Sequence, residues 1–408
     1  MKHKITALIS MLFSGAILSA QMPGGITMQQ ASGPQGTTLG ANTTSGAAGI
    51  ALGNRVVMRG YVDFVYGHTD FSEDIENDTR FTTSADVDFL FDFSPVTAEV
   101  HLAATTDNIG LEQAFGRYAF NRDFNIFFGR QVTSLGYEGD EATDLSSVTT
   151  AYFLDNAIKQ NKFMTGLRNM AIDYDLRNTI YNSSTLGAFF NAGGTVTVDG
   201  VTLATETEYT EAYDKYMSSI SQLRKNYVDG VKANFNNGRF GLSLGLHDGY
   251  WGSDDFNDNI ALDIAASVMI IPGLEARLGY AHQESDDYSD VSHLNGWISY
   301  NPGDLTLAFE FDTFDIQDSA EIWDMMLMAN YQFSNWFGLT LRYSHEDVEN
   351  LSIGMFDLDY DSHRISLALL FAVTQNFGIN FEYSHTEWDG DGWDDSADEV
   401  YVEGLLSF

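Results

Sequence analysis

Charged side chains recur at every second position along several extended runs of this sequence. Asp86, Asp88 and Asp92 alternate with apolar residues, and side chains two residues apart on a β-strand point to the same face. A face that carries several carboxylates attracts cations and repels anions. The same alternation places further charged residues on the polar faces of other runs: Asp63, Glu99, Arg277, Glu310, Asp312, Arg342 and Arg364.

Histidines and acidic loops are the other groups that could do chemistry. His345 and His385 lie beside acids, but neither has a neighbouring nucleophile or a spacing typical of an active site. The segment 389–395 begins like a calcium-binding loop, yet Asp394 stands where such a loop requires glycine. We therefore expect no catalytic residue, no metal site and no cofactor, with a loose divalent site in this acidic loop as the alternative.

The composition excludes several classes of protein. The chain has 408 residues, with 20 Lys and Arg against 58 Asp and Glu and a formal net charge of -38, so we expect it to repel nucleic acid. The absence of Cys excludes disulfides and thiolate chemistry. Only 5 Pro stand beside 37 Gly, 29 Phe and 20 Tyr, and this composition favours an all-β fold.

The N-terminal segment has the order of a secretory signal. Lys2 and Lys4 precede an apolar run that ends in small residues, so we expect residues 1–20 to be a signal peptide, with an uncleaved anchor as the alternative. Residues 21–54 are rich in Gly, Ser and Thr and are expected to form a flexible leader, a tether or a partial plug. The folded domain is expected to span 55–408.

The alternating runs are long for a soluble protein. Each has about 10 to 14 residues, which is enough to cross a bilayer at a tilt near 45°. About 18 such runs can be traced from Arg55 to Phe408. We therefore expect a transmembrane, antiparallel, up-and-down β-barrel of about 16 to 18 strands.

The connections between these runs fall into two alternating sets. Tight turns are indicated at 94–95, 121–123, 177–178, 236–238, 272–273, 301–304, 334–336 and 374–376. Longer, mostly acidic connections alternate with them at 67–79, 134–163, 191–221, 251–258, 349–357 and 389–397. An outer-membrane barrel keeps its short turns on the periplasmic side and its long loops outside.

The last run carries the most specific local signal. Val400, Val402 and Leu406 share one face with the terminal Phe408. This amphipathic, aromatic-ended strand resembles the terminal signature that the barrel-assembly machinery of the outer membrane recognises. Pairing it with the strand that starts at Arg55 would close the sheet and leave no unpaired edge.

One hairpin resembles a known family. The segments 116–120, 126–130 and 135–138 form a strand, a second strand ending in Gly-Arg, and a Gly-Tyr-Glu loop. This arrangement resembles the OmpL-like β-barrel porin family. The resemblance implies an outer-membrane pore for passive diffusion of small hydrophilic solutes, with outer-membrane lipid around it.

If the apolar faces meet lipid, the polar faces line the pore. Acids outnumber bases about two to one on these faces, so we expect the pore to prefer cations. By analogy with general porins, the connection 134–163 is expected to fold inward and narrow the pore. The proposed constriction residues are Glu138, Asp140, Glu141 and Asp144, opposed by Arg59 and Arg117. The alternative is an ordinary solvated loop.

Two other functional interpretations remain open. An outer-surface structural or adhesive barrel would act through its acidic loops rather than through a pore. A soluble secreted β-protein is the third interpretation. Since many porins form trimers, a homotrimer is compatible with the sequence, although no interface can be identified from it.

Overall fold

A computed structural model of the chain describes most of the domain expected to fold. The described residues are 50–72, 78–105, 109–139, 142, 145–152, 196–198, 201–203, 205, 224, 227–251, 259–285, 290–317, 320–353, 356–390 and 393–408. No helix in this part of the chain is long and apolar enough to cross a membrane.

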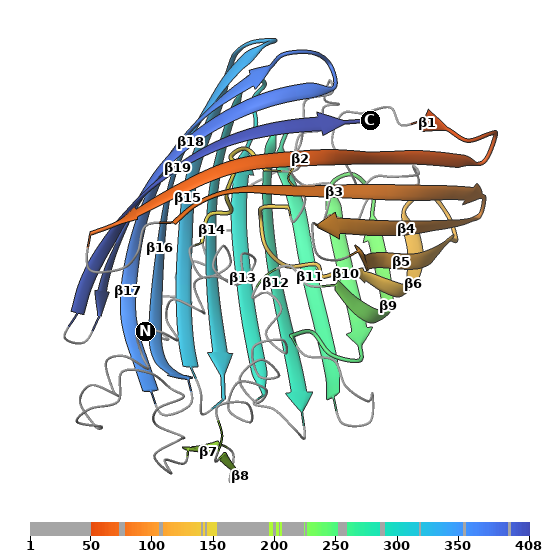
Figure 1. The fold of residues 1–408 in the computed structure, drawn as a ribbon. Helices are drawn as coiled ribbons and strands as arrows, with labels where there is room; N and C mark the ends of the chain where they lie inside the picture. The colour runs from red at the N-terminus through yellow and green to blue at the C-terminus, as the bar shows by residue number, and fades with distance from the viewer. Residues whose placement is uncertain are drawn as a thin grey trace.

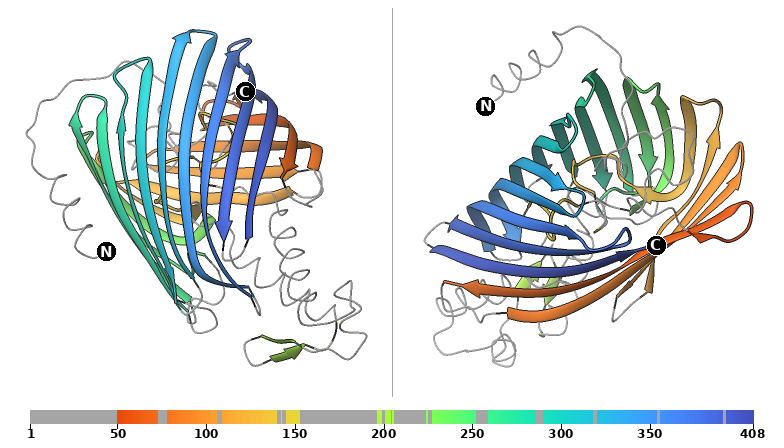
Figure 2. Two further views of the ribbon diagram at one scale, coloured as in Figure 1. Left: turned by 90° about the vertical axis from the view of Figure 1, so that its left-hand side faces the viewer. Right: turned by 90° about the horizontal axis from the view of Figure 1, so that it is seen from above.

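The structure is a closed, antiparallel barrel of 16 strands, as predicted (Figures 1 and 2). Its strands are β2 (Val56–Phe71), β3 (Asp78–Phe93), β4 (Val96–Thr105), β5 (Ile109–Ala119), β6 (Phe124–Val132), β9 (Tyr227–Asn236), β10 (Phe240–His247), β11 (Asn259–Ile271), β12 (Leu274–Ser285), β13 (Val291–Tyr300), β14 (Leu305–Ile316), β15 (Ala320–Ser334), β16 (Phe337–Ile353), β17 (Phe356–Ala372), β18 (Phe377–Gly390) and β19 (Trp393–Ser407). Each strand pairs with the next one along the chain.

Three short strands lie outside this series. Strand β1 (Ile50–Ala51) pairs with the start of β2, so the last residues of the expected leader contact the barrel. Strands β7 (Val196–Val198) and β8 (Val201–Leu203) form a separate two-stranded ribbon (Figure 1).

The first and last barrel strands close the sheet. Strand β19 pairs with β2 from Ala397 opposite Phe71 to Ser407 opposite Tyr61. The terminal Phe408 extends this ladder, because its N–H donates to the carbonyl of Gly60 at 2.9 Å and its carbonyl accepts from the Gly60 N–H at 3.0 Å. Closure leaves no free edge in the barrel.

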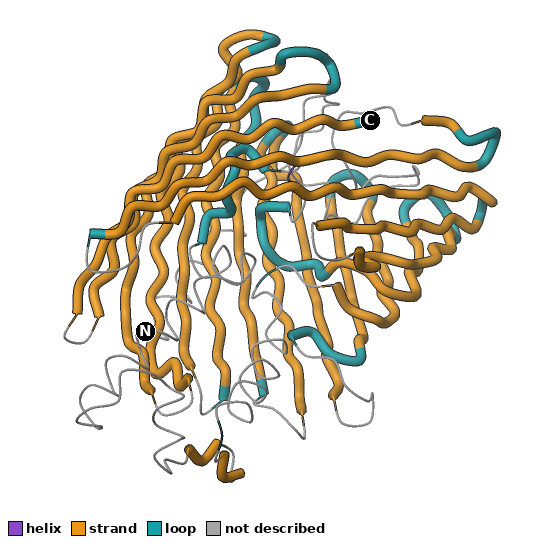
Figure 3. Tube along the Cα trace, in the orientation of Figure 1, coloured by secondary structure: helices purple, strands orange, loops and turns teal. Residues whose placement is uncertain are grey.

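The connections divide between the two ends of the barrel (Figure 3). At the short-turn end, glycine permits tight reversals: Gly273 has φ +81°, and a Cβ there would lie 2.3 Å from the Asn301 carbonyl oxygen. At the long-loop end, the longest connection joins β6 to β9. These two strands pair directly, from Phe124 opposite Phe235 to Val132 opposite Tyr227, and none of the described residues between them adds a strand to the barrel.

Two expected loops differ from the structure, and the turn expected at 177–178 lies outside the described residues. The loops expected at 349–357 and 389–397 are mostly strand, because β16 and β17 pair as far as Ile353 opposite Phe356, and β18 and β19 as far as Gly390 opposite Trp393. Acidic residues disfavour isolated strands, but the neighbouring strand supplies their backbone hydrogen bonds.

The side chains of the barrel are distributed in the opposite way to those of a soluble protein. On β10, Leu242, Leu244 and Leu246 are exposed, whereas the alternating Ser243 and His247 are buried. The outer surface is therefore apolar and the inner face polar, which suits an apolar solvent outside the barrel.

We predict that Gly60→Val blocks closure of the barrel. A Cβ at this position would lie 2.2 Å from the Asp86 carbonyl oxygen and 3.0 Å from the Phe408 ring, and such overpacking costs about 1–3 kcal/mol. The expected result is loss of the compact, fast-migrating species on unboiled gels.

Gly110→Val on β5 is the matched control, because a Cβ there meets nothing within 4 Å. This variant should migrate like the unmodified protein. Equal migration of both variants would contradict the closure at Gly60.

Candidate functional site: a segment folded into the barrel

The inner face of the barrel carries most of the charged residues identified in the sequence. Asp63, for example, lies between the exposed Val62 and Phe64 and points the other way. Among the residues predicted to line a pore, Asp86, Asp88, Glu99, Arg277, Glu310, Asp312, Arg342 and Arg364 are buried, and Asp63 and Asp92 are partly buried.

The segment that follows β6 covers part of this inner face. We call residues 133–152 the inner segment, of which 133–139, 142 and 145–152 are described. Leu135 is fully buried in a cluster with Ala261 and Ala281, and a Cβ on Gly279 would lie 2.3 Å from its side chain. Figure 2 shows the segment within the ring of strands.

Arg342 on β16 binds the inner segment through both terminal nitrogens. Its Nη1 donates to Glu138 Oε1, Ser147 Oγ and the Thr149 carbonyl, each at 2.8 Å. Its Nη2 donates to the Thr150 carbonyl at 2.9 Å and to the Thr149 hydroxyl at 3.1 Å. The guanidinium is 1% exposed, so these bonds form away from bulk water, where they are strong.

Glu382 on β18 holds the same segment from the neighbouring wall. Its carboxylate accepts the backbone N–H groups of Val148 at 2.6 Å and Thr149 at 3.0 Å, and the Thr149 hydroxyl at 2.5 Å. Arg342 Nη2 lies 3.7 Å from Glu382 Oε1. The segment therefore lies between an arginine and a carboxylate that also neutralise each other.

A second anchor lies on β14. The Tyr137 N–H donates to Glu310 Oε1 at 2.5 Å, and the Tyr152 hydroxyl lies 3.3 Å from Glu310 Oε2. Asp312 accepts from Asn295 at 2.8 Å, and Arg224 lies 3.4 Å from it. Tyr137 and Tyr152, near the two ends of the inner segment, thus both meet Glu310.

The tyrosines of the inner segment remain neutral. Burial raises the pKa of Tyr137 and the pKa of Tyr152, and the neighbouring acids raise both further. Arg224 lies 3.5 Å above the Tyr152 ring, and such a cation–π contact stabilises the guanidinium among apolar groups. Tyr137 packs edge-on against Trp297, with ring centroids 5.6 Å apart.

The structure assigns the proposed constriction residues to different places. Glu138 is in the inner segment, where it forms an ion pair with Arg342. Arg117 on β5 donates to Thr97 at 3.1 Å. The described residues of the inner segment contact strands from β10 to β18, since Ser134 meets Ser243 and Thr149 meets Glu382. Asp140, Glu141 and Asp144 lie outside the described residues.

Three anchoring residues were not proposed as part of a constriction. Arg342 and Glu382 could be identified only as polar residues on alternating runs, since the segment they bind is about 200 residues away in sequence. Arg224 belongs to no alternating run. Their roles depend on a contact between distant parts of the chain, which local patterns do not report.

Solved structures of outer-membrane proteins share this architecture. They include the outer-membrane channel DcaP of Acinetobacter baumannii (TM-score 0.55, 12% identity, 89% of this chain and 100% of that chain) and an anion-selective porin from Comamonas acidovorans (TM-score 0.51, 14%, 86% and 99%). A third is the trimer form of OmpT from Vibrio cholerae (TM-score 0.50, 12%, 87% and 100%). The chain has the barrel fold of these proteins.

These similarities extend to the fold alone, because the sequence identities are low. No protein-family model matches the sequence, and no curated protein matches it. The porin-like barrel therefore rests on architecture, and the finer resemblance to the OmpL-like family has no support from these comparisons.

We predict that Arg342→Met releases the inner segment. The substitution removes five hydrogen bonds of the guanidinium and the ionic partner of the buried Glu138, which costs about 3–5 kcal/mol for a buried ion pair. A protease specific for glutamate should then cut the folded barrel after Glu138.

Arg239→Met is the control, because Arg239 lies at the short-turn end beside Phe240 and far from this segment. The control should resist cleavage like the unmodified protein. Protection of Arg342→Met at the same protease concentration would show that other contacts are sufficient to hold the inner segment in place.

Proposed function

We propose that this chain is an outer-membrane porin: a water-filled channel for passive diffusion of small hydrophilic solutes. The observation that carries the proposal is a closed barrel of 16 strands that is apolar outside and charged inside. A barrel of this size is wide enough to leave water in its interior. The similar solved structures, which include a channel and a porin by name, agree with it.

An aromatic row on the outer surface supports placement in a membrane. At the short-turn end, Phe333, Trp336, Phe337 and Phe371 form a row of contacting rings on the outer surface. His345 lies eight residues after Phe337 on β16, which corresponds to about 20 Å along the barrel axis for a strand tilted near 40°. The apolar band between Phe337 and His345 is close to the height of about 25 Å that such barrels present to lipid.

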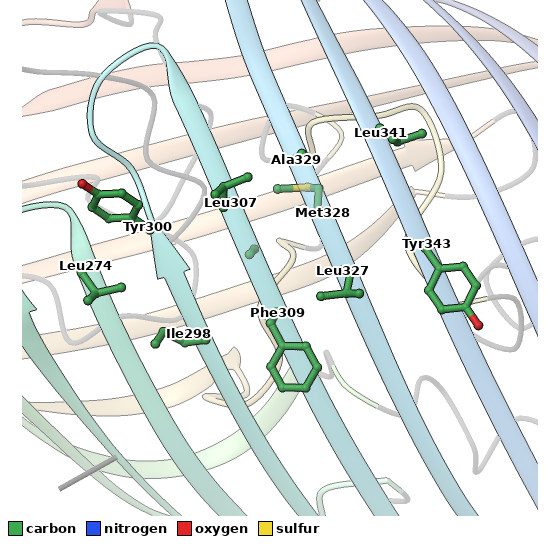
Figure 4. A pocket seen from close by; sticks show the side chains of 11 residues that line it. Leu274, Ile298, Tyr300, Leu307, Phe309, Leu327, Met328, Ala329, Leu341 and Tyr343 are labelled. Carbon is green, nitrogen blue, oxygen red and sulfur yellow. The ribbon is translucent and has the colours of Figure 1, made fainter. Parts of the chain in front are cut away.

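The outer surface also offers a contact for lipid chains. Between β12 and β16, Leu307, Leu327 and Leu341 surround the small side chain of Ala329 and leave an apolar hollow of about 500 Å³ (Figure 4). Tyr300 and Tyr343 border it. An acyl chain of the outer-membrane lipid fits this chemistry, so lipid is the proposed partner of this face.

Export and assembly follow from the two ends of the chain. We propose that residues 1–20 act as a signal peptide and that residues 21–54 lead into the barrel. The short-turn end would then face the periplasm. We also propose that the strand ending at Phe408 is read by the barrel-assembly machinery. Since it supplies the closing edge with β2, recognition of this strand would precede closure.

The inner charges suggest a preference for cations. The described inner face has the paired arginines Arg342 and Arg364, each bound to a glutamate. Asp86 and Asp88 add negative charge on the facing wall. We propose a cation-preferring channel, in which Glu138 and the sequence neighbours Asp140, Glu141 and Asp144 contribute to the narrowest part. Arg59 and Arg117 remain proposed basic residues of the opposite wall.

A second candidate is an outer-surface structural or adhesive barrel. The observation that favours it is the extensive burial of inner charges, which indicates that chain segments occupy part of the interior. Neither candidate involves catalysis. We propose no enzymatic activity and no nucleic-acid partner, and a homotrimer is proposed by analogy with the trimer form of the Vibrio protein.

We predict that the purified, folded protein forms stable conducting channels in planar bilayers and admits small neutral sugars in liposome-swelling assays. Conductance follows from the hydrated inner face, and an upper size limit for sugars follows from the inner segment. A folded, heat-modifiable protein without conductance would reject the porin and favour the structural barrel.

We further predict that Asp86→Asn with Asp88→Asn lowers the ratio of cation to anion permeability roughly twofold or more, since two carboxylates of the inner face lose their charge. The measurement is the reversal potential under a salt gradient. Asp123 and Asp304 lie at the short-turn end. Replacing both by Asn changes the net charge equally and should shift the reversal potential less. Equal shifts of the reversal potential would contradict the placement of Asp86 and Asp88 along the ion path.

A further inference from the structure

Two histidines face each other on the outward-pointing side of β16 and β17, where His363 is 47% exposed and His345 is 8% exposed. His345 on β16 lies opposite His363 on β17, and two residues further toward the long-loop end Asp347 lies opposite Asp361. Residues at these positions share one face of an antiparallel pair. Because Arg342, Ser344 and Glu346 point inward and are buried, this square of two histidines and two aspartates points away from the interior.

The ligand atoms of this group are close together. The two Nδ1 atoms are 3.2 Å apart, and His363 Nε2 lies 3.4 Å from Asp361 Oδ1. One nitrogen of each histidine and one carboxylate oxygen of Asp361 all lie within 4.8 Å of one another. Ligands of a tetrahedral zinc ion, at bond lengths of about 2.0–2.1 Å, are separated by about 3.3 Å, so the histidine pair is already at this spacing.

Neighbouring groups hold these side chains in place. The rings of His345 and His363 stack at 4.5 Å with an angle of 24°, and Trp323 on β15 covers His345 at 4.6 Å. The Trp323 indole N–H donates to Asp347 Oδ2 at 2.5 Å. Such surrounding contacts orient metal ligands and limit the entropy lost on binding.

The same nitrogens also have protein partners. His345 Nδ1 lies 2.9 Å from the Ser362 carbonyl oxygen, and the Tyr343 hydroxyl lies 2.7 Å from His363 Nδ1. Small rotations of the two rings away from these partners would let one nitrogen of each ring donate its lone pair to a bound ion. The side chains of His363 and Asp361 are 47% and 46% exposed, so an ion can reach them.

We propose that His345, His363 and Asp361 form a binding site for a divalent transition-metal ion of the zinc or copper class, with Asp347 beside it. Two imidazoles favour such ions over magnesium and calcium, which require mainly oxygen ligands. Nearby acids add attraction, since Glu387 on β18 lies opposite His363. The site lies outside the bore and is independent of any channel activity.

Such an ion would also brace the β16–β17 hairpin. The ladder between these strands is interrupted between Val348 and Leu351, just beyond the proposed site. An ion bound to both strands below this interruption stabilises the folded barrel by a free energy that grows with the logarithm of the ion concentration relative to its dissociation constant.

The test uses the full folded protein in detergent micelles with Zn²⁺ or Cu²⁺ alone. We expect calorimetry to show one dominant Zn²⁺ site per chain, and His363→Asn to weaken it at least about tenfold. With Cu²⁺, the electron paramagnetic resonance spectrum should show coupling to two imidazole nitrogens, reduced to one in His363→Asn. Asp361→Asn should weaken binding while retaining both nitrogens.

His282→Asn is the matched control. His282 lies on β12, its Nδ1 is 2.9 Å from Ser292 Oγ, and it belongs to no metal-binding group within the described residues. This variant should bind like the unmodified protein. Equal binding by His363→Asn and the unmodified protein, or an equal loss in His282→Asn, would overturn the proposal. All variants are compared after their heat-modifiable migration shows a folded barrel.

Discussion

The backbone hydrogen bonds that join β19 to β2 are the constraint on which the rest of the structure depends. An open sheet of this size would expose two edges with unpaired N–H and C=O groups, which no apolar solvent can satisfy. The closing ladder runs to the terminal Phe408, whose N–H and C=O groups both form hydrogen bonds with the backbone of Gly60. Only a residue without a Cβ fits there, because the Asp86 carbonyl is so close. Once the cylinder is closed, each strand has one outer and one inner face, and the placement of all other side chains follows from that alternation.

Closure creates an enclosed interior, and the inner segment lies inside it. Buried charges are costly unless they are paired and hydrogen-bonded, and the contacts of the segment meet this requirement. Arg342 and Glu382 each bind several groups of the segment and also lie near each other, while Glu310 accepts from both Tyr137 and Tyr152. These polar anchors come from β14 to β18, and Leu135 packs on β11 and β12, so the segment lies along the wall from β11 to β18. The opposite wall, with Asp86, Asp88 and Arg117, retains its own charges.

Much of the fold could be predicted from the sequence because its signals are local. The alternation of Leu242, Leu244 and Leu246 with polar residues, the turn at Gly273 and the aromatic end at Phe408 each depend on a few neighbouring residues. Predictions failed where a distant partner decides the structure. The acidic stretches at 349–357 and 389–397 have the composition of loops, but pairing with the adjacent strand makes them strands. The turn expected at 177–178 lies outside the described residues, and β6 pairs directly with β9.

The sequence by itself determined which side chains share a face, because that follows from the covalent geometry of an extended chain. It thereby determined the closed all-β class and the charged inner face. Tertiary structure alone decided which of these groups meet. Glu138 contacts Arg342, and His345 contacts His363, only because strand register and the path of the inner segment bring them together. Register and loop insertion depend on the sum of many weak contacts between residues far apart in sequence, and no short pattern encodes that sum.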